Sequence, residues 1–383
     1  MYFKRLCPLP KEPVRSFFLW GPRQVGKTCL LKNLYPDARY FDLNLSDTWA
    51  SFSAAPQLLR EQLLALSSRP ALVLLDEVQR VPLLLNEIQS LIDQHQFVFG
   101  LCGSSARKLK HGGGNLLGGR ALRYEMHGFV SAELGPDFDL HRAVNRGGMP
   151  NLYLSSTIER EFETYVGDYV RDEIAAEGLV RNLPIFSNFL TVAAISDGHT
   201  LNFSKIGSEC GISPKTAQEY FHILQDTLLG FFLPAYSRRL KRRVRLSPKF
   251  YFSDTGIANF LARRGTIIPG SEMYGRAFES WVVHEVRSYR EYSEKFFELS
   301  YYQELDAEIE IDLILNDFEV ALEIKSSEKV GDTHLKSMRK LKAPAAKKRL
   351  IVSRETTARL TADGIEILPI HEFLSRLWGG AII

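Results

Sequence analysis

Cysteine is scarce in this chain and is spread out along it. The 383 residues include four cysteines and no CxxC pair. This spacing fits neither a zinc site nor the disulfide framework of a small secreted domain. We therefore expect small buried thiols in a reducing compartment.

Long apolar runs and a strong excess of one charge are also missing. No apolar stretch approaches the roughly 18 residues that a membrane-spanning helix needs, and the opening segment MYFKRLCPLPKEPVRSFFLWG lacks a continuous signal-peptide core. The formal net charge of +3 indicates no particular partner by itself. We expect a cytoplasmic protein with no membrane contact. Its length indicates two or three domains.

The first strong motif is a phosphate-binding loop. The apolar run FFLW at 17–20 leads into GPRQVGKT at 21–28, a complete GxxxxGK[ST] motif followed by the amphipathic run CLLKNLY. In such a loop, backbone N–H groups and the positive end of the helix dipole surround phosphates. Lys27 would reach the β- and γ-phosphates of ATP, and the hydroxyl of Thr28 would bind Mg²⁺.

A second motif suits hydrolysis. The segment ALVLLDEVQ at 71–79 predicts a buried strand of a parallel sheet, with Asp76 and Glu77 at its C-terminal end. Asp76 would hold Mg²⁺ through water as a second metal-site residue beside Thr28, and Glu77 would polarise the attacking water. The predicted nucleotide contacts are Gly21, Pro22, Arg23, Gln24, Val25, Gly26, Lys27, Thr28, Cys29, Asp76 and Ser104.

Two further positions have open interpretations. Ser104 and Ser105 end the apolar strand FVFGLCGSS at 97–105, where they either sense the γ-phosphate or form a plain serine turn. Arg120 follows two glycines, and it is either an arginine finger for a nucleotide of the same or a neighbouring subunit or a salt-bridge partner.

The motifs together resemble a known family. The runs GPRQVGKT, LLDEVQRVP, GSSARKL and GGRALRYEMHGFVSAEL are similar to the AAA-type ATPase domain of a large prokaryotic family. In that family the ATPase is followed by a winged-helix segment and by a domain that resembles PD-(D/E)xK nucleases. The resemblance covers essentially the whole chain and is most specific in the ATPase motifs.

The middle of the chain has a helix-turn-helix pattern. In LNFSKIGSECGISPKTAQEYFHILQDTLL at 201–229, Ser204 is a candidate cap for a short helix, a glycine turn follows, and Pro214 begins a second helix. Side chains at the start of the second helix would reach DNA base edges. These are Lys215, Thr216 and Gln218.

A basic run follows this pattern. Six cationic residues crowd eight positions where a winged helix would have its wing. They suit phosphate contacts. A solvated edge strand is one alternative, and protein contacts by the winged helix are another. The residues are Arg238, Arg239, Lys241, Arg242, Arg243 and Arg245.

The C-terminal segment contains an acidic hairpin. In EIEIDLILNDFEVALEIKSS at 308–327, alternation puts Glu308, Glu310 and Asp312 on one face of the first strand and Ile309, Ile311 and Leu313 on the other. A turn near Asn316 would place Asp312 opposite or diagonal to Glu323, within about 5–8 Å. Two carboxylates this close need a cation between them, or a proton.

The hairpin also resembles the PD-(D/E)xK pattern. Glu279 on a helix, Asp312 on a strand and Glu323-Ile-Lys325 on the next strand fill its positions, although Ile311 stands where the pattern has proline. The resemblance implies that Glu279, Asp312 and Glu323 bind Mg²⁺ or Mn²⁺ and that Lys325 orients or deprotonates water. An ordinary hairpin, or a nuclease-like domain that no longer cleaves, remains open.

We expect an α/β protein of three domains: a P-loop ATPase with a parallel sheet (1–150), a helical lid and winged helix (151–265), and a smaller mixed α/β domain like a restriction endonuclease (266–383). The predicted function is ATP hydrolysis coupled to nucleic acid, with DNA favoured, and the chain is a candidate homo-oligomer. The alternative is a nucleotide-dependent switch or DNA motor whose C-terminal domain does not cleave.

Overall fold

The computed structural model describes residues 2–68, 70–105, 117–170, 180, 182–237, 247–304, 308–341 and 346–383. The chain divides into two compact units. The N-terminal unit consists of Lys4–His127 with Asp226–Leu228. The C-terminal unit consists of Gly128–Gln225 and Leu229–Ile383, together with the residues before Lys4.

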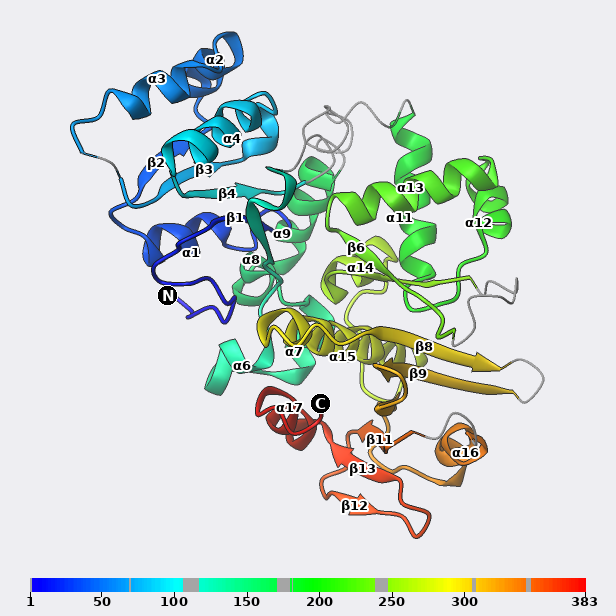
Figure 1. Ribbon diagram of the computed structural model, residues 1–383. Helices are drawn as coiled ribbons and strands as arrows, with labels where there is room; N and C mark the ends of the chain where they lie inside the picture. The colour runs from blue at the N-terminus through cyan, green and yellow to red at the C-terminus, as the bar shows by residue number, and fades with distance from the viewer. Residues whose placement is uncertain are drawn as a thin grey trace. The chain divides into compact units, whose positions relative to one another are not determined.

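A five-stranded sheet forms the centre of the N-terminal unit (Figure 1). The strand order is β2-β3-β4-β1-β5, and every neighbouring pair is parallel. All residues of β1, β3 and β4 are buried, as expected for a parallel sheet covered on both faces. The strands are β1 (Ser16–Trp20), β2 (Arg39–Asp42), β3 (Val73–Asp76), β4 (Phe99–Gly103) and β5 (Ala121–Glu125).

Helices cover both faces of this sheet. The helices α2, α3 and α4 contribute apolar side chains to one core cluster with the strands, and Figure 1 shows α1 on the opposite side of the sheet from α4. The elements are α1 (Lys27–Leu34), α2 (Ser46–Ala54), α3 (Leu58–Leu64), α4 (Leu84–His95) and the short turns η1 (Val78–Arg80) and η2 (Leu117–Gly119).

The first part of the C-terminal unit is mainly helical, with one antiparallel pair of strands. The helices are α6 (Ser131–Leu134), η3 (Gly135–Asp137), α7 (Leu140–Arg146), α8 (Pro150–Leu154), α9 (Ile158–Thr164), η4 (Tyr165–Val170), α11 (Leu183–Ile195), α12 (Phe203–Cys210), α13 (Pro214–Asp226) and α14 (Thr255–Leu261). The strands are β6 (Gly230–Leu233) and β7 (Lys249–Phe252).

The helix-turn-helix region follows the sequence pattern with one correction. Pro214 begins α13, as predicted. The cap of α12 is Asn202, whose side chain accepts a hydrogen bond from the backbone N–H of Lys205 at 3.0 Å. Ser204 lies inside the helix, so its prediction as the cap was wrong. The amide oxygen of Asn202 already fills that role, two residues earlier.

Asp254 caps α14 and also holds a distant loop. One carboxylate oxygen accepts from the backbone N–H of Ile257 at 3.0 Å, and the other accepts from Gly148 at 2.7 Å and Met149 at 3.0 Å. Because the side chain is buried, the removal of these acceptors would leave three buried N–H groups without partners. This contact joins the start of α14 to the loop before α8.

A six-stranded mixed sheet organises the rest of this unit, in the order β12-β13-β11-β10-β9-β8. The pairs β8–β9, β9–β10 and β12–β13 are antiparallel, and the pairs β10–β11 and β11–β13 are parallel. The strands are β8 (Leu299–Glu304), β9 (Ile309–Leu315), β10 (Val320–Ile324), β11 (Lys348–Ser353), β12 (Arg359–Leu360) and β13 (Glu366–Pro369). The helices are α15 (Glu272–Tyr292), α16 (Asp332–Lys340) and α17 (Ile370–Trp378).

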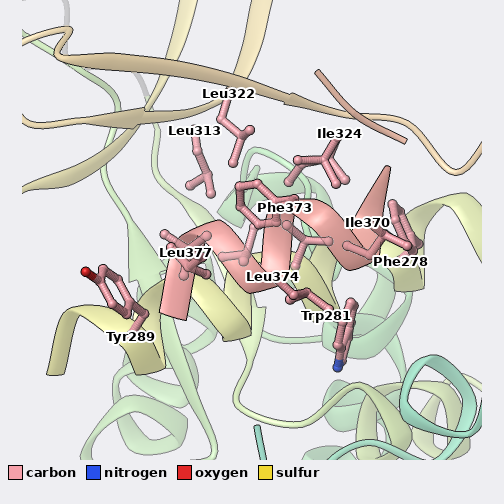
Figure 2. Close-up of a cluster of buried hydrophobic side chains, with 14 of the residues drawn as sticks. Phe278, Trp281, Tyr289, Leu313, Leu322, Ile324, Ile370, Phe373, Leu374 and Leu377 are labelled. Carbon is pink, nitrogen blue, oxygen red and sulfur yellow. The ribbon is translucent and has the colours of Figure 1, made fainter. Parts of the chain in front are cut away.

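Each face of this sheet has its own core. Figure 2 shows α17 between the sheet and α15, with Phe373 and Leu377 near the strand residues Leu313 and Leu322. On the other face, Met338 of α16 belongs to the cluster that contains Ile311. The mixed α/β domain and the hairpin between β9 and β10 therefore agree with the sequence prediction.

The alternation predicted for β9 was wrong at one point. Ile311 and Leu313 are two residues apart, yet they lie in the cores on opposite faces. The pairs Ser300↔Ile314 and Tyr302↔Ile311 show why: two steps along β8 match three steps along β9. One extra residue in β9 makes a β-bulge around Asp312, which reverses the faces beyond it.

No helix in the part of the chain that the structure describes is long and apolar enough to span a membrane.

Replacement of Asp254 by alanine should destabilise the C-terminal unit by about 3 kcal/mol, because each buried N–H left unpaired costs about 1–3 kcal/mol. The control is Asp139→Ala, which removes an exposed cap from α7, where Asp139 accepts from Arg142. That change should cost about 1 kcal/mol. Denaturant unfolding would measure both, and equal losses would contradict the dual role of Asp254.

Candidate functional site

The phosphate-binding loop connects β1 to α1. Gly26 immediately precedes α1 and has φ of 100°, a left-handed conformation that glycine adopts without strain. Gln24 also has a positive φ, of 60°. Positive φ is uncommon for a residue with a side chain, and such strain tends to occur at ligand-binding loops.

Lys27 is buried and faces its own loop. Its Nζ donates to the backbone carbonyls of Gly21 at 2.8 Å and Pro22 at 2.9 Å. Its charge also acts on Asp76 and lowers the pKa of that carboxyl. A buried ammonium group whose hydrogen bonds go to neutral carbonyls is suited to an anionic ligand. The loop and Lys27 therefore fit the phosphates of ATP.

Asp76 collects donors from two other segments. Its Oδ2 accepts from the hydroxyl of Thr28 at 2.5 Å and from the hydroxyl of Tyr40 at 2.7 Å. Burial favours a higher pKa for Asp76, but the hydrogen bonds from Thr28 and Tyr40 outweigh it and lower the pKa. The carboxylate therefore stays ionised beside Thr28, and these two oxygen ligands fit Mg²⁺.

Glu77 is held by a small polar network. Its backbone lies in the left-handed region, with φ of 56°. Its Oε2 accepts from Gln79 Nε2 and, at 3.2 Å, from the hydroxyl of Ser104, and Gln79 also donates to Ser104 at 3.0 Å. All three side chains are buried. Ser104 thus contacts the predicted general base, and Gln79 is a member of this network that the sequence analysis missed.

The C-terminal unit gathers a second set of charged side chains. Glu279 on α15 accepts from the hydroxyl of Tyr251 at 2.7 Å and lies 3.7 Å from Lys249 Nζ. Lys249 also pairs with Glu310 at 2.8 Å. Burial and the negative charge of Asp312 raise the pKa of Glu279 to about 7. Lys249 and Tyr251 both belong to β7, which the sequence analysis did not connect with this set.

The hairpin carries the other half of the set. Leu313 of β9 pairs with Leu322 of β10 across the antiparallel strands. Asp312 comes directly before Leu313, and Glu323 comes directly after Leu322. Asp312 accepts from the backbone N–H of Ile324 at 2.7 Å, and Glu323 pairs with Lys325 at 2.6 Å. Burial and the charge of Asp312 raise the pKa of Glu323 to about 8.

The predicted metal ligands are near one another but are not arranged around a common point. In the described ranges no group of three or more His, Cys, Asp or Glu side chains could hold a metal ion. Lysine, tyrosine or backbone donors contact Glu279, Asp312 and Glu323 instead. One feature does fit a missing cation, because Glu323 Oε2 is buried without a hydrogen-bond partner.

The predicted nucleic-acid contacts are only partly described. Lys215 and Gln218 are exposed in the first turns of α13, whereas the Thr216 hydroxyl contacts that of Ser213 at 2.8 Å. The basic run lies outside the described residues. It comprises Arg238, Arg239, Lys241, Arg242, Arg243 and Arg245.

Three family models match the chain. Residues 14–135 match an AAA domain. Residues 137–266 match a domain of unknown function, DUF8612, and residues 274–373 match another, DUF4143. Residues 14–135 form an AAA-type ATPase domain.

Curated relatives include the uncharacterized proteins Rv2008c of Mycobacterium tuberculosis and Mb2031c of Mycobacterium bovis. Each is 26% identical over 261 residues, which is 66% of this chain, and the match spans 57% of the relative's length.

Similar solved structures include the Aeropyrum pernix ORC1 protein in complex with DNA, at 14% identity and a TM-score of 0.30, covering 66% of this chain and 87% of that one. A STAND protein with a tetratricopeptide repeat sensor from Pyrococcus horikoshii is 12% identical, with a TM-score of 0.21, covering 73% and 48%.

A buried arginine that the sequence analysis missed braces the phosphate-binding loop of the ATPase domain. Arg5 donates to the backbone carbonyl of Val25 at 2.7 Å and to that of His127 at 2.5 Å. It precedes the matched AAA segment and belongs to no motif, so no sequence signal marked it. Its guanidinium fixes the carbonyl next to Gly26.

Arg120 is a salt-bridge partner in this structure. Its Nε lies 2.7 Å from Asp93 near the end of α4. This contact agrees with the second of the two interpretations of Arg120. Its role as an arginine finger stays a prediction, which requires the side chain to leave Asp93.

Replacement of Gln79 by leucine should lower the kcat of ATP hydrolysis about tenfold and leave ATP affinity nearly unchanged, because it frees Glu77 from its orienting donor. Gln62→Leu, at an exposed position of α3, is the control. Steady-state ATPase assays and nucleotide-binding titrations would separate the two effects. An unchanged kcat would show that Gln79 does not orient Glu77 for hydrolysis.

Proposed function

We propose that the chain couples ATP hydrolysis in its AAA-type domain to nucleic acid and to a metal-dependent, nuclease-like C-terminal domain. The observation that carries the proposal is the ATP site, where buried Lys27 donates its hydrogen bonds to backbone carbonyls near ionised Asp76. We assign three domains: the ATPase (1–150), a helical lid with a winged helix (151–265) and the nuclease-like domain (266–383).

The chemistry of the ATPase follows from the contacts of the site. Lys27 and the loop N–H groups would bind the β- and γ-phosphates, while Thr28 and Asp76 would hold Mg²⁺, which neutralises phosphate charge. Glu77, kept in place by Gln79 and Ser104, would accept a proton from the attacking water. ATP and Mg²⁺ are therefore the proposed cofactors.

Nucleic-acid binding is proposed for the middle domain. Two helices joined by a short turn, α12 and α13, precede the antiparallel strands β6 and β7, an order that supports a winged helix. Lys215 and Gln218 are exposed at the start of α13. The six basic residues between β6 and β7 in sequence supply enough charge for phosphate contacts. DNA is the favoured ligand, and a homo-oligomer remains part of the proposal.

A non-cleaving C-terminal domain is the second candidate. It is favoured by the contacts that Lys249, Lys325 and Tyr251 make with the acids, since compensated carboxylates need no metal. In this version the chain would be an ATP-driven switch or motor. If a metal does bind, then Glu279, Asp312 and Glu323 would hold it, and it would lower the pKa of a bound water near Lys325.

Strand cleavage would decide between the two candidates. Purified chain would be incubated with single- and double-stranded DNA and with RNA, in Mg²⁺ or Mn²⁺, with and without ATP. We expect cleavage that Asp312→Asn abolishes and that Lys27→Ala reduces, because ATP binding gates the C-terminal site. ATP hydrolysis with no cleavage in any condition would favour the switch or motor.

Neutralisation of the six basic residues to glutamine should weaken DNA binding and flatten its dependence on salt. Each phosphate contact contributes about 0.9 to the slope of log K against log[salt]. The control is a double change of exposed Lys4 and Lys11 to serine. Fluorescence anisotropy at several salt concentrations would measure the slope, and an unchanged slope would refute DNA contact by this run.

A further inference from the structure

Lys249 is a buried lysine that comes from outside the acidic segment. It is the first residue of β7, and its side chain is 4% exposed. Its ammonium group lies 2.8 Å from Glu310 and 3.7 Å from Glu279, and also 5.4 Å from the ring centre of Tyr301. A lysine in an otherwise aromatic strand, KFYF, therefore ends within the carboxylate set of another segment.

Even with Lys249 in place, one carboxylate of the neighbouring hairpin is only partly neutralised. Lys325 neutralises Glu323 on one oxygen only, and the other oxygen, Oε2, is buried without a hydrogen-bond partner in the described structure. Tyr251 donates a hydrogen bond to Glu279 on α15, and the ammonium group of Lys249 lies 3.7 Å from the same carboxylate. The carboxylate that would complete a metal site is thus paired with two side chains of β7, while Glu323 keeps one oxygen without a hydrogen-bond partner in the described structure.

We propose that Lys249 is a built-in counter-ion that keeps a divalent cation out of this carboxylate set, and that Mg²⁺ or Mn²⁺ enters only when its ammonium group withdraws. The inference rests on the proposed metal-dependent role of the C-terminal domain. An ammonium group 3.7 Å from Glu279 repels a dication in a poorly solvated site.

Mn²⁺ binding to the full chain without nucleotide tests the proposal. All variants would carry Thr28→Ala so that the ATP site does not contribute, and free Mn²⁺ would be measured by electron paramagnetic resonance. We expect Lys249→Met to bind Mn²⁺ at least about tenfold more tightly than the parent, and added Asp312→Asn to remove that binding. Lys205→Met, which breaks an exposed pair with Glu209, is the control and should change nothing.

An unchanged Mn²⁺ affinity in folded Lys249→Met would overturn the proposal. If that variant fails to fold, chemical labelling of Lys249 in the chain that keeps this lysine tests the proposal instead. Mass spectrometry would follow the reaction of Lys249 with an amine reagent, with exposed Lys205 as reference. Saturating Mn²⁺ should raise the labelling of Lys249 severalfold, and constant labelling would contradict the withdrawal.

The cleavage assay separates this inference from the proposed function. Tighter Mn²⁺ binding by Lys249→Met without strand cleavage would sustain the counter-ion and refute the nuclease. Cleavage by the parent chain, with no change of Mn²⁺ affinity in Lys249→Met, would support the nuclease and refute the counter-ion.

Discussion

Buried carboxylates constrain both units, because an ionised carboxylate that leaves water has to be compensated by donors or by cations. In the ATPase domain, hydroxyl groups compensate Asp76: Thr28 and Tyr40 bring the start of α1 and the strand β2 to the end of β3. The compensation keeps Asp76 charged, while the hydrogen bonds of the Lys27 ammonium group go to backbone carbonyls. The same hydrogen bonds thus shape the sheet edge and leave a positive group for phosphate.

The C-terminal unit meets this constraint differently. Its acids are compensated by lysines, and the raised pKa values of Glu279 and Glu323 show that the compensation is incomplete. Burial and the nearby charge of Asp312 both favour the protonated forms. A site of this kind can gain stability from a proton or from a metal ion, whereas the lowered pKa of Asp76 favours its ionised form.

The sequence was most informative where chemistry is local. The phosphate-binding loop, the acids after β3 and the hairpin of β9 and β10 each depend on short spacing, so pattern and periodicity predicted them. The alternation along β9 failed because the bulge at Asp312 is set by the pairing with β8, which no period reveals. Gln79 lies two positions after Glu77 and offered a weak signal. Arg5 offered none, because its acceptors are backbone carbonyls.

The distinction between local and distant partners also separates the two lysines of the C-terminal set. Lys325 is two residues from Glu323 along one stretch of chain and directly follows β10, so its place follows from the end of that strand. Lys249 reaches the acids from β7, where its side chain contacts Glu279, Glu310 and the ring of Tyr301. A change at β7 can therefore remove one cation of this carboxylate set and leave the other in place.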